Sequence, residues 1–226
     1  MASRKTAAPK RRAATNRLAT RLERAARASI EILRQQEAPF ALIGGIALAL
    51  RAAPRATQDV DFAVAIDDAA AERLVHAFQD SGFQIDAVLV NKGDRTLATV
   101  RVHDPKTKVL VDLLISFCGI EQEIVNGATL ERWRDLMLPV VSRGHLIAMK
   151  VLANRKQDQA DLESLLRVLR EEDKRQALHA VKQIMAAHRG HGRDLEEELK
   201  RLLVEVRPVL PPGFELRAQP AKRRRR

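Results

Sequence analysis

The N-terminal part of the chain carries apolar residues at steps of three and four, the spacing that places them on one face of a helix. These residues are Leu18, Leu22, Ala26, Ile30 and Leu33. The pattern predicts a helix from about Thr15 to Gln36, which ends before Pro39. Residues 1–14 lack this pattern and are expected to form a disordered basic arm.

The middle of the chain is dominated by short apolar runs separated by turn-forming residues, which is typical of strands. The expected strands are Phe40–Ile43, Val60–Ile66, Gln84–Val90, Leu97–His103 and Val109–Ile115. Two helices are expected between the first three strands, Ile46–Ala53 and a helix from Asp67 or Asp68 to about Asp80. Strands joined by turns, after a strand–helix start, predict a mixed sheet and an α/β (α+β) fold.

The pattern changes after the last of these strands. Residues 119–135 are expected to be helical, and Leu138–Val141 is at best an edge strand because Pro139 has no N–H to donate. Ser142 is expected to cap a helix that carries Lys150. Further helices are expected at about 158–170, 174–189 and 193–206, before Pro208.

These patterns divide the chain of 226 residues into four parts. We expect a basic arm over 1–14 and a core with its N-terminal helix over 15–141. A helical region follows over 142–207, and a basic tail that contains prolines completes the chain over 208–226. The length suits one domain with a helical extension.

Positive charge is concentrated at the two ends of the chain. Residues 1–24 hold eight Lys and Arg and one Glu, which gives +7, and residues 217–226 hold six Lys and Arg and no acid, which gives +6. The total of +11 leaves 11 − 13 = −2 for residues 25–216. Basic ends of this kind bind polyanions such as RNA, and they also serve solubility alone.

The composition excludes several classes of protein. Cys118 is the single cysteine, so no internal disulfide framework exists and a reducing compartment, the cytoplasm, is expected. No apolar run is long enough to span a membrane, and the N-terminus lacks the apolar segment of a secretory signal.

The chemistry of the chain centres on two glycines and two acids. Gly44 and Gly45 follow a predicted strand, and Asp59 and Asp61 stand two residues apart at the start of the next one. Acids at this spacing share one face of a strand, where they repel each other unless a cation lies between them. Glycines allow backbone N–H groups to approach a phosphate. The arrangement indicates phosphoryl transfer with a divalent ion such as Mg²⁺.

A third acid, Asp112, lies in the apolar run Val109–Ile115. An unpaired carboxylate within a buried strand is costly, and a metal ion would offset that cost. Alternatively, Asp112 is an acid of the core whose partners satisfy it. Likewise, Asp59 and Asp61 could be acids of a turn or an edge strand.

The order Gly44-Gly45, Asp59, Asp61 and Asp112 resembles the signature of the DNA polymerase β-like nucleotidyltransferases. The resemblance implies a mixed-sheet nucleotidyltransferase core with a C-terminal helical bundle. It also implies two Mg²⁺ ions held by these three acids, with NTP as the substrate.

A second stretch narrows the resemblance to a branch of that superfamily. Lys150 in His145–Arg155, followed by Asp158 and Asp161, resembles the lysine helix and the Asp-x-x-Asp motif of the AbiEii-type nucleotidyltransferase toxins. The spacing from the lysine to Arg155 is shorter than in that pattern. The resemblance covers about residues 40–166 and implies that Lys150 contacts the triphosphate of the NTP.

Other residues are weaker candidates for the site. Thr57 and Arg155 are expected near phosphate, although Thr57 could equally stabilise a turn and Arg155 could simply be solvated. Asp158 is expected to be the N-cap of its helix, with Asp161 in the first turn. Asp161 is also placed to orient Lys150 for nucleotide binding.

Three functions therefore remain open on sequence grounds. The first is a Mg²⁺-dependent enzyme that transfers an NMP to RNA, for instance the 3′ end of tRNA, as a toxin with an antitoxin partner. The second transfers the NMP to a small molecule, as antibiotic nucleotidyltransferases do. The third is a non-catalytic nucleic-acid-binding module on the same fold, which the presence of all three acids argues against.

Overall fold

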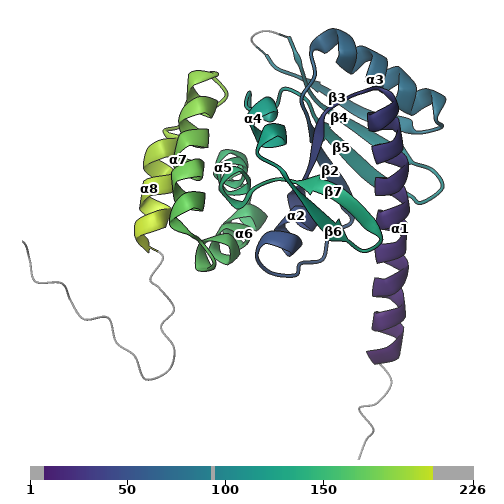
Figure 1. Cartoon of the computed structure of the whole chain (residues 1–226), viewed down its shortest axis with the longest axis horizontal. Coiled ribbons are helices and arrows are strands. Elements are labelled where there is room, and N and C mark those ends of the chain that lie inside the picture. Colours follow the sequence, from purple (N-terminus) through teal and green to yellow (C-terminus); the bar gives the residue numbers. More distant parts are fainter. Residues whose placement is uncertain (1–7, 93–94, 206–226) are drawn as a thin grey trace, which may run out of the picture.

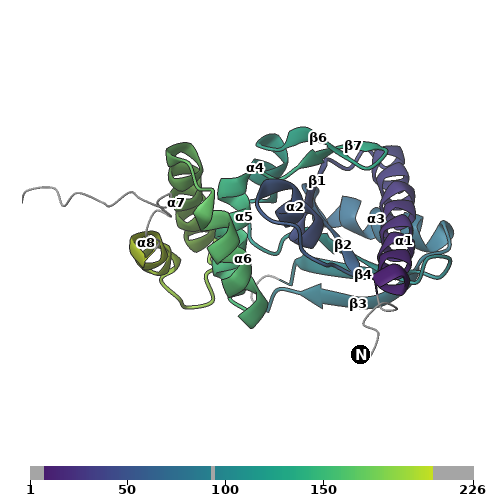
Figure 2. The same ribbon diagram turned by 90° about the horizontal axis from the view of Figure 1, so that it is seen from below.

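A computed structural model of the chain describes residues 8–92 and 95–205. A seven-stranded mixed sheet forms the centre of the molecule, with strand order β3-β4-β5-β2-β1-β7-β6 (Figure 1). Helices α1 and α3 lie at one end of the molecule and α5 to α8 at the other, as both views show (Figures 1 and 2). The α/β class and the mixed sheet expected from the sequence are confirmed.

The first half of the chain contains three helices and five strands. They are α1 (Ala8–Gln35), β1 (Phe40–Ile43), α2 (Gly44–Arg51), β2 (Asp59–Val64), α3 (Asp68–Asp80), β3 (Gln84–Val90), β4 (Leu97–Asp104) and β5 (Val109–Leu114). Strands β1 and β3 have the predicted bounds, and Asp67 caps α3 through its side chain. Apolar residues of α1 and α3 are buried with those of the strands in one core.

The second half contains a β-hairpin and four longer helices after a short one. Its elements are α4 (Glu121–Asn126), β6 (Thr129–Trp133), β7 (Leu136–Val140), α5 (Arg143–Ala153), α6 (Lys156–Arg167), α7 (Glu171–Ala186) and α8 (Leu195–Glu205). The predicted cap of α5 is confirmed, because the side chain of Ser142 accepts a hydrogen bond from the His145 N–H.

Two sequence expectations about this half of the chain were wrong. Residues 119–135 are not one helix, because α4 ends at Asn126 and β6 begins at Thr129. Strand β7 is not an edge strand, since it lies between β1 and β6. Pro139 has no N–H to donate to a neighbouring strand. It is tolerated in β7 because the pairing of β7 with β1 covers only Leu42 and Val140.

The N-terminal expectation also needs correction. Residues 8–14 are helical, so α1 begins seven residues before the predicted start and the expected disordered arm is wrong for these residues. Residues 1–7 and the tail 208–226 lie outside the described residues. The N-terminal end of α1 projects beyond the body of the molecule (Figure 1).

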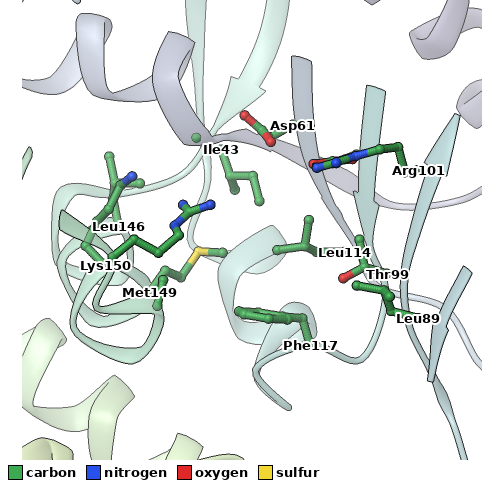
Figure 3. Close-up of a pocket in the computed structure, with 14 residues that line it drawn as sticks. Ile43, Asp61, Leu89, Thr99, Arg101, Leu114, Phe117, Leu146, Met149 and Lys150 are labelled. Atoms are coloured by element: carbon green, nitrogen blue, oxygen red, sulfur yellow. The ribbon is translucent and has the colours of Figure 1, made fainter. Parts of the chain in front are cut away.

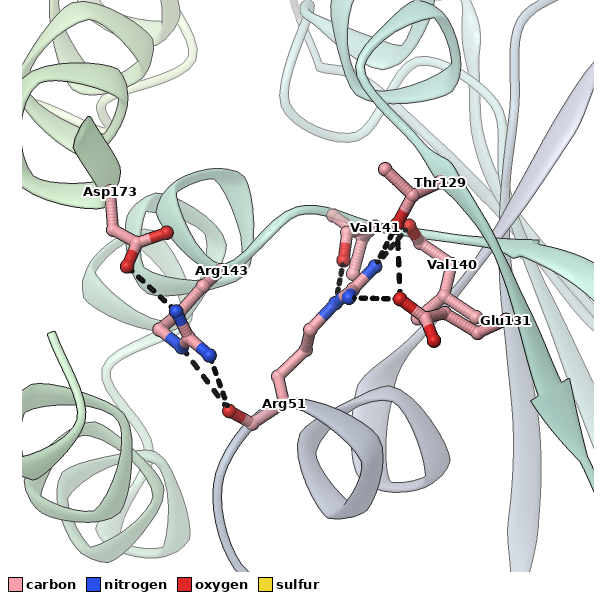
Figure 4. A network of polar contacts seen from close by, with 7 residues as sticks. All are labelled: Arg51, Thr129, Glu131, Val140, Val141, Arg143 and Asp173. Carbon is pink, nitrogen blue, oxygen red and sulfur yellow. Dashed lines mark hydrogen bonds and ion pairs between the residues drawn. The ribbon is translucent and has the colours of Figure 1, made fainter. Parts of the chain in front are cut away.

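One arginine ties α2 to the hairpin and to the helical region (Figure 4). The guanidinium of Arg51 donates to the carbonyl oxygens of Val140 and Val141 at 2.9 and 2.7 Å and to Glu131 at 2.8 Å. The carbonyl of Arg51 accepts from Arg143, which also pairs with Asp173 of α7 at 2.7 Å. These contacts fix the helices relative to the end of the sheet where β1 runs into α2.

Among the described residues, no helix is both long and apolar enough to cross a membrane.

Candidate nucleotide and metal site

The turn between β1 and α2 is shaped around a carboxylate. Gly44 has a φ of +66°, a conformation that favours glycine. A Cβ atom at this position would lie 1.9 Å from Oδ2 of Asp61. The Asp61 carboxylate therefore packs directly onto the backbone of Gly44, and any side chain at position 44 would displace it.

Asp61 lies beside two other acids. Asp59 precedes it by two residues on β2, and Asp112 is its in-register partner on the parallel strand β5. Removal from water and the charges of Asp59 and Asp112 raise the pKa of Asp61 to about 7. Lys150 and a hydrogen bond from the Gly45 backbone oppose this rise.

The loop before β2 supports Asp59. The hydroxyl of Thr57 donates a hydrogen bond to Oδ1 of Asp59. A Cβ atom at Gly45 would lie 2.7 Å from that hydroxyl oxygen, so the loop and the glycine turn are in close contact. Thr57 thus positions an acid of the pair, which is the turn role that the sequence left open for it.

Asp112 has a different partner. Arg101 on β4 lies opposite Asp112 in the sheet. Its Nε donates to Oδ1 at 2.7 Å and its Nη2 to Oδ2 at 2.6 Å. These hydrogen bonds, and then the charge of Asp112, raise the pKa of Arg101 further above its ordinary value. Asp112 is therefore a buried acid that a guanidinium satisfies.

The three acids of the site differ in what already contacts them. Asp59 and Asp61 share one face of β2, and removal from water, then the charges of Asp59 and Asp112, raise the pKa of Asp61. Within residues 8–92 and 95–205, no group of three or more His, Cys, Asp or Glu is arranged to hold a metal ion. Both oxygens of Asp112 are engaged by Arg101, and a metal site of Asp59, Asp61 and Asp112 stays a prediction.

Lys150 faces the site from α5 and is almost fully buried, with 5% of its surface exposed. Its Nζ lies 2.7 Å from Oδ1 of Asp158 and 2.8 Å from Oδ2 of Asp161. Arg55, which precedes Thr57 in the loop, lies 3.6 Å from the other oxygen of Asp161. Asp161 therefore contacts two cations of the site and is itself 2% exposed.

Asp158 is the third residue of α6, and the N-cap of that helix is Arg155, so the sequence expectation of an Asp158 cap was wrong. Its carboxylate accepts from the backbone N–H of Arg155 at 3.0 Å and from Nε of Arg155 at 2.8 Å. Although burial acts to raise it, hydrogen bonds from Arg155 and Lys150 hold the pKa of Asp158 below its ordinary value.

A cavity of about 300 Å³ opens between these groups. In Figure 3, Asp61 and Arg101 lie on the side of the sheet, and Leu146, Met149 and Lys150 lie on the side of α5. Apolar residues complete its wall: Ile43, Leu89, Leu114, Phe117 and Ala153. The size is at the small end for ligand pockets, which are mostly apolar with a few polar groups.

The structure brings together part of the set expected from the sequence. Gly44, Asp61, Asp112, Lys150 and Arg155 line the cavity. Four expected residues are not in its wall: Gly45, Thr57, Asp59 and Asp161. Gly45 follows Gly44, Asp59 precedes Asp61 by two residues on β2, and Asp161 pairs with Lys150, whereas Thr57 contacts Asp59. Lys150 and Arg155 bring positive charge to the helix side of the cavity, and Asp61 and the Arg101–Asp112 pair lie on the strand side.

Sequence reasoning missed Arg101 and the pairing of Asp158. One available signal for Arg101 was the alternation in β4, where it stands between the buried Val100 and Val102 and so faces the other side of the sheet. The partner could not be read from this signal, because it depends on the register between β4 and β5.

Residues 31–223 match the family described as the nucleotidyl transferase AbiEii toxin of type IV toxin–antitoxin systems. The match spans most of the chain. The chain belongs to the AbiEii family. The resemblance expected from Gly44-Gly45, the three acids and the lysine helix is thereby confirmed, and the AbiEii protein is a nucleotidyltransferase with an NTP as its substrate.

Several solved structures are similar to this AbiEii protein, although none of those cited here reaches 25% identity. An antigenic nucleotidyltransferase-like protein from Paracoccidioides brasiliensis is 20% identical, with 82% of this chain and 93% of that chain covered and a TM-score of 0.45. ANT(2″)-Ia in complex with adenylyl-2″-tobramycin is 13% identical, with 75% and 97% covered and a TM-score of 0.48.

A putative nucleotidyltransferase from Thermotoga maritima is 13% identical, with 65% of this chain and 92% of that chain covered and a TM-score of 0.45. No curated protein matches the chain.

Proposed function

We propose that this AbiEii protein transfers an NMP from an NTP to a hydroxyl group of RNA, for instance at the 3′ end of tRNA. The transfer would depend on Mg²⁺, and the protein would act as a toxin that an antitoxin partner counteracts. One observation carries the catalytic part of the proposal: Asp59 and Asp61 lie beside the Gly44-Gly45 turn with the pKa of Asp61 raised to about 7.

The reaction forms a bond between the acceptor oxygen and the α-phosphorus of the NTP. The bond from that phosphorus to the bridging oxygen breaks, and pyrophosphate leaves with the electron pair. Asp112, which lines the cavity, is the group that takes the proton of the acceptor hydroxyl. Lys150 and Arg155, on the opposite side of the cavity, bind the triphosphate.

A divalent ion would be held by Asp59 and Asp61, where it would neutralise the phosphate oxygens. The hydroxyl of Thr57 fixes the orientation of Asp59, and the Gly44 backbone fixes that of Asp61. Asp158 and Asp161 act through Lys150, because they hold its ammonium group toward the cavity from behind.

An RNA acceptor is supported by the distribution of charge. Residues 1–24 carry +7 and residues 217–226 carry +6, whereas the rest of the chain carries −2. The N-terminal end of α1 projects from the body of the molecule (Figure 1). Basic segments at the ends of a chain attract a polyanion such as RNA through its phosphates.

The test is to incubate the full chain with total RNA, MgCl₂ and each labelled NTP in turn. We expect label in RNA with at least one NTP, a size class that identifies the acceptor, and no label with Asp61→Asn. Asp80→Asn is the matched control, because Asp80 is an exposed acid at the end of α3. Absence of labelled RNA with every NTP and RNA pool would contradict the RNA proposal.

Transfer to a small molecule is the second candidate function. The net charge of −2 over residues 25–216 favours it, since the body that holds the cavity is not itself basic. It predicts labelling of a hydroxylated cationic compound, such as an aminoglycoside, while RNA stays unlabelled. The same reaction with a panel of such compounds decides between the two acceptors.

A further inference from the structure

The third acid of the site has a partner that occupies both of its oxygens. Arg101 and Asp112 face each other across β4 and β5, with Nε–Oδ1 and Nη2–Oδ2 distances of 2.7 and 2.6 Å. The side chain of Asp112 is 12% exposed, whereas that of Arg101 is 45% exposed, and both residues line the cavity. Figure 3 shows Arg101 on the sheet side of the cavity, so the more accessible member of the pair is the guanidinium.

A bidentate arginine–carboxylate pair uses lone pairs of both oxygens in the plane of the carboxylate. A divalent ion would approach Asp112 along the same directions, so Arg101 and an ion compete for this acid. Within residues 8–92 and 95–205, no ion pair engages Asp59 or Asp61, although the charge of Lys150 acts on Asp61. Thr57 contacts one oxygen of Asp59, and Asp61 lies against glycine backbone. Asp59 and Asp61 could thus accept a metal ion, whereas Asp112 already contacts a positive charge of the chain, Arg101.

We propose that the guanidinium of Arg101 replaces the acceptor-side metal ion, so that this enzyme works with a single divalent ion bound at Asp59 and Asp61. This inference rests on the proposed nucleotidyl transfer. Arg101 engages one lone pair on each oxygen of Asp112, which leaves the carboxylate further lone pairs to accept from the acceptor hydroxyl. The guanidinium also lines the cavity, where negative charge would develop on the acceptor oxygen as it attacks.

The arrangement has a consequence for the metal requirement. The charge on the acceptor side belongs to the chain, so the rate should rise hyperbolically with metal concentration. Removing the guanidinium would leave Asp112, Asp59 and Asp61 as three acids without a cation on β2 and β5. Such a cluster should recruit a second ion, and the rate should then depend on metal concentration with a sigmoidal curve.

The test is to count Mn²⁺ ions bound to the full chain by electron paramagnetic resonance, with a saturating α,β-methylene NTP present. The variants are Arg101→Ala, Arg101→Lys and, as matched control, Arg132→Ala, an exposed arginine on β6 outside the cavity. We expect one ion per chain in the wild type, in Arg101→Lys and in the control, and two in Arg101→Ala.

The transfer rate supplies a second readout. Arg101→Ala should lose about 100-fold at low MnCl₂ and recover most of this at high MnCl₂ with a sigmoidal curve, because the second ion restores the missing charge. Arg101→Lys should show a smaller loss and a hyperbolic curve, since it keeps the charge and loses the two-pronged contact.

Two ions in the wild type would overturn the inference, because Arg101 would then move aside when metal binds. A single ion in Arg101→Ala would also overturn it. Neither result would affect the proposed nucleotidyl transfer. A wild type that binds neither the nucleotide nor Mn²⁺ would instead contradict the proposed function itself.

Discussion

Two pairs of aspartates meet at the site, and they are compensated in opposite ways. Asp158 and Asp161 are nearly inaccessible to solvent, and each lies within 2.8 Å of the Lys150 ammonium nitrogen. Asp59 and Asp61 are half-buried, and removal from water together with the charges of Asp59 and Asp112 raises the pKa of Asp61 to about 7. Removal from water therefore acts on both pairs, and the charges around each pair decide the direction of the shift.

The two pairs differ because Asp158 and Asp161 contact a cation of the chain, Lys150. Hydrogen bonds from Arg155 and Lys150 keep the pKa of Asp158 below its ordinary value in spite of burial. On β2, by contrast, removal from water and the charges of Asp59 and Asp112 each raise the pKa of Asp61 by more than Lys150 lowers it. The first pair is complete without a ligand, whereas the second is left with negative charge that a divalent ion would neutralise.

The largest expected effect is the loss of turnover when Asp59 or Asp61 is replaced. Asp61→Asn and Asp59→Asn should each lower the rate of transfer by about 10³-fold, because the ion that stabilises the transition state loses a ligand. Neither variant should lower the temperature of unfolding. Steady-state rates with Asp80→Asn as control test this. Wild-type turnover in either variant would mean that the replaced acid has no role in catalysis.

For Asp158 and Asp161, by contrast, removing the cation should lower the stability of the folded protein. Lys150→Met should lower the free energy of unfolding by about 3–5 kcal/mol, because it leaves two buried carboxylates without their cation. Lys182→Met is the matched control, since the Lys182 side chain is 60% exposed, and it should change the free energy by less than about 0.5 kcal/mol.

Urea unfolding of both lysine variants at pH 8 gives the comparison. If Lys150→Met were as stable as the control, Lys150 would not compensate the acids, and the contrast between the two pairs would fail. A further loss of NTP affinity in Lys150→Met, measured under conditions where the variant is folded, would support the triphosphate role.

A smaller effect concerns pH. The pKa of Asp61 is raised on folding, so the folded state keeps this proton to a higher pH than the unfolded state, and stability falls as pH rises from about 4 to about 7. Asp61→Asn should therefore be more stable than the metal-free wild type above pH 7, by about 1–2 kcal/mol after allowance for solvent screening.

The difference between Asp61→Asn and wild type should nearly vanish below about pH 4, where the carboxyl group is protonated in both the folded and the unfolded protein. Urea unfolding in EDTA at several pH values measures it. A difference that is constant with pH would mean that the charge of Asp61 is already compensated within the chain.

The sequence predicts the arrangement of Asp59 and Asp61 better than that of Asp158 and Asp161, for a physical reason. The Gly44-Gly45 turn and the spacing of Asp59 and Asp61 are local features, and local patterns also gave strands β1 and β3 their correct bounds. The pairing of Asp158 with Lys150 depends instead on how α6 packs against α5. The Arg101–Asp112 contact likewise depends on strand register, which single-sequence patterns do not specify.

Strand β6 was missed for a related reason. Residues 119–135 contain charged and apolar positions that fit a helix over the first part, and α4 does occupy Glu121–Asn126. The remainder becomes Thr129–Trp133, a strand that pairs with β7. Pairing with a partner across a turn overrides the local preference in that segment.

The smallest expected effect tests the acceptor rather than the acids. Removing residues 1–7 and 217–226 leaves every described residue in place and removes eight Lys and Arg and no acid. RNA affinity should then fall less steeply with salt, because fewer counterions are released, and the choice of NTP should not change. Equal salt slopes for the full and shortened chains would mean that these ends do not contact the acceptor.

The most direct test of the account is whether metal binding requires the uncompensated pair. The temperature of unfolding at pH 8 should rise with MgCl₂ in the wild type and in Asp80→Asn, because the ion binds only the folded state. No rise should occur in Asp59→Asn or Asp61→Asn. Asp158→Asn should keep the metal-dependent rise from a lower starting temperature, since that acid is paired with Lys150. A rise of equal size in Asp61→Asn and wild type would contradict the account.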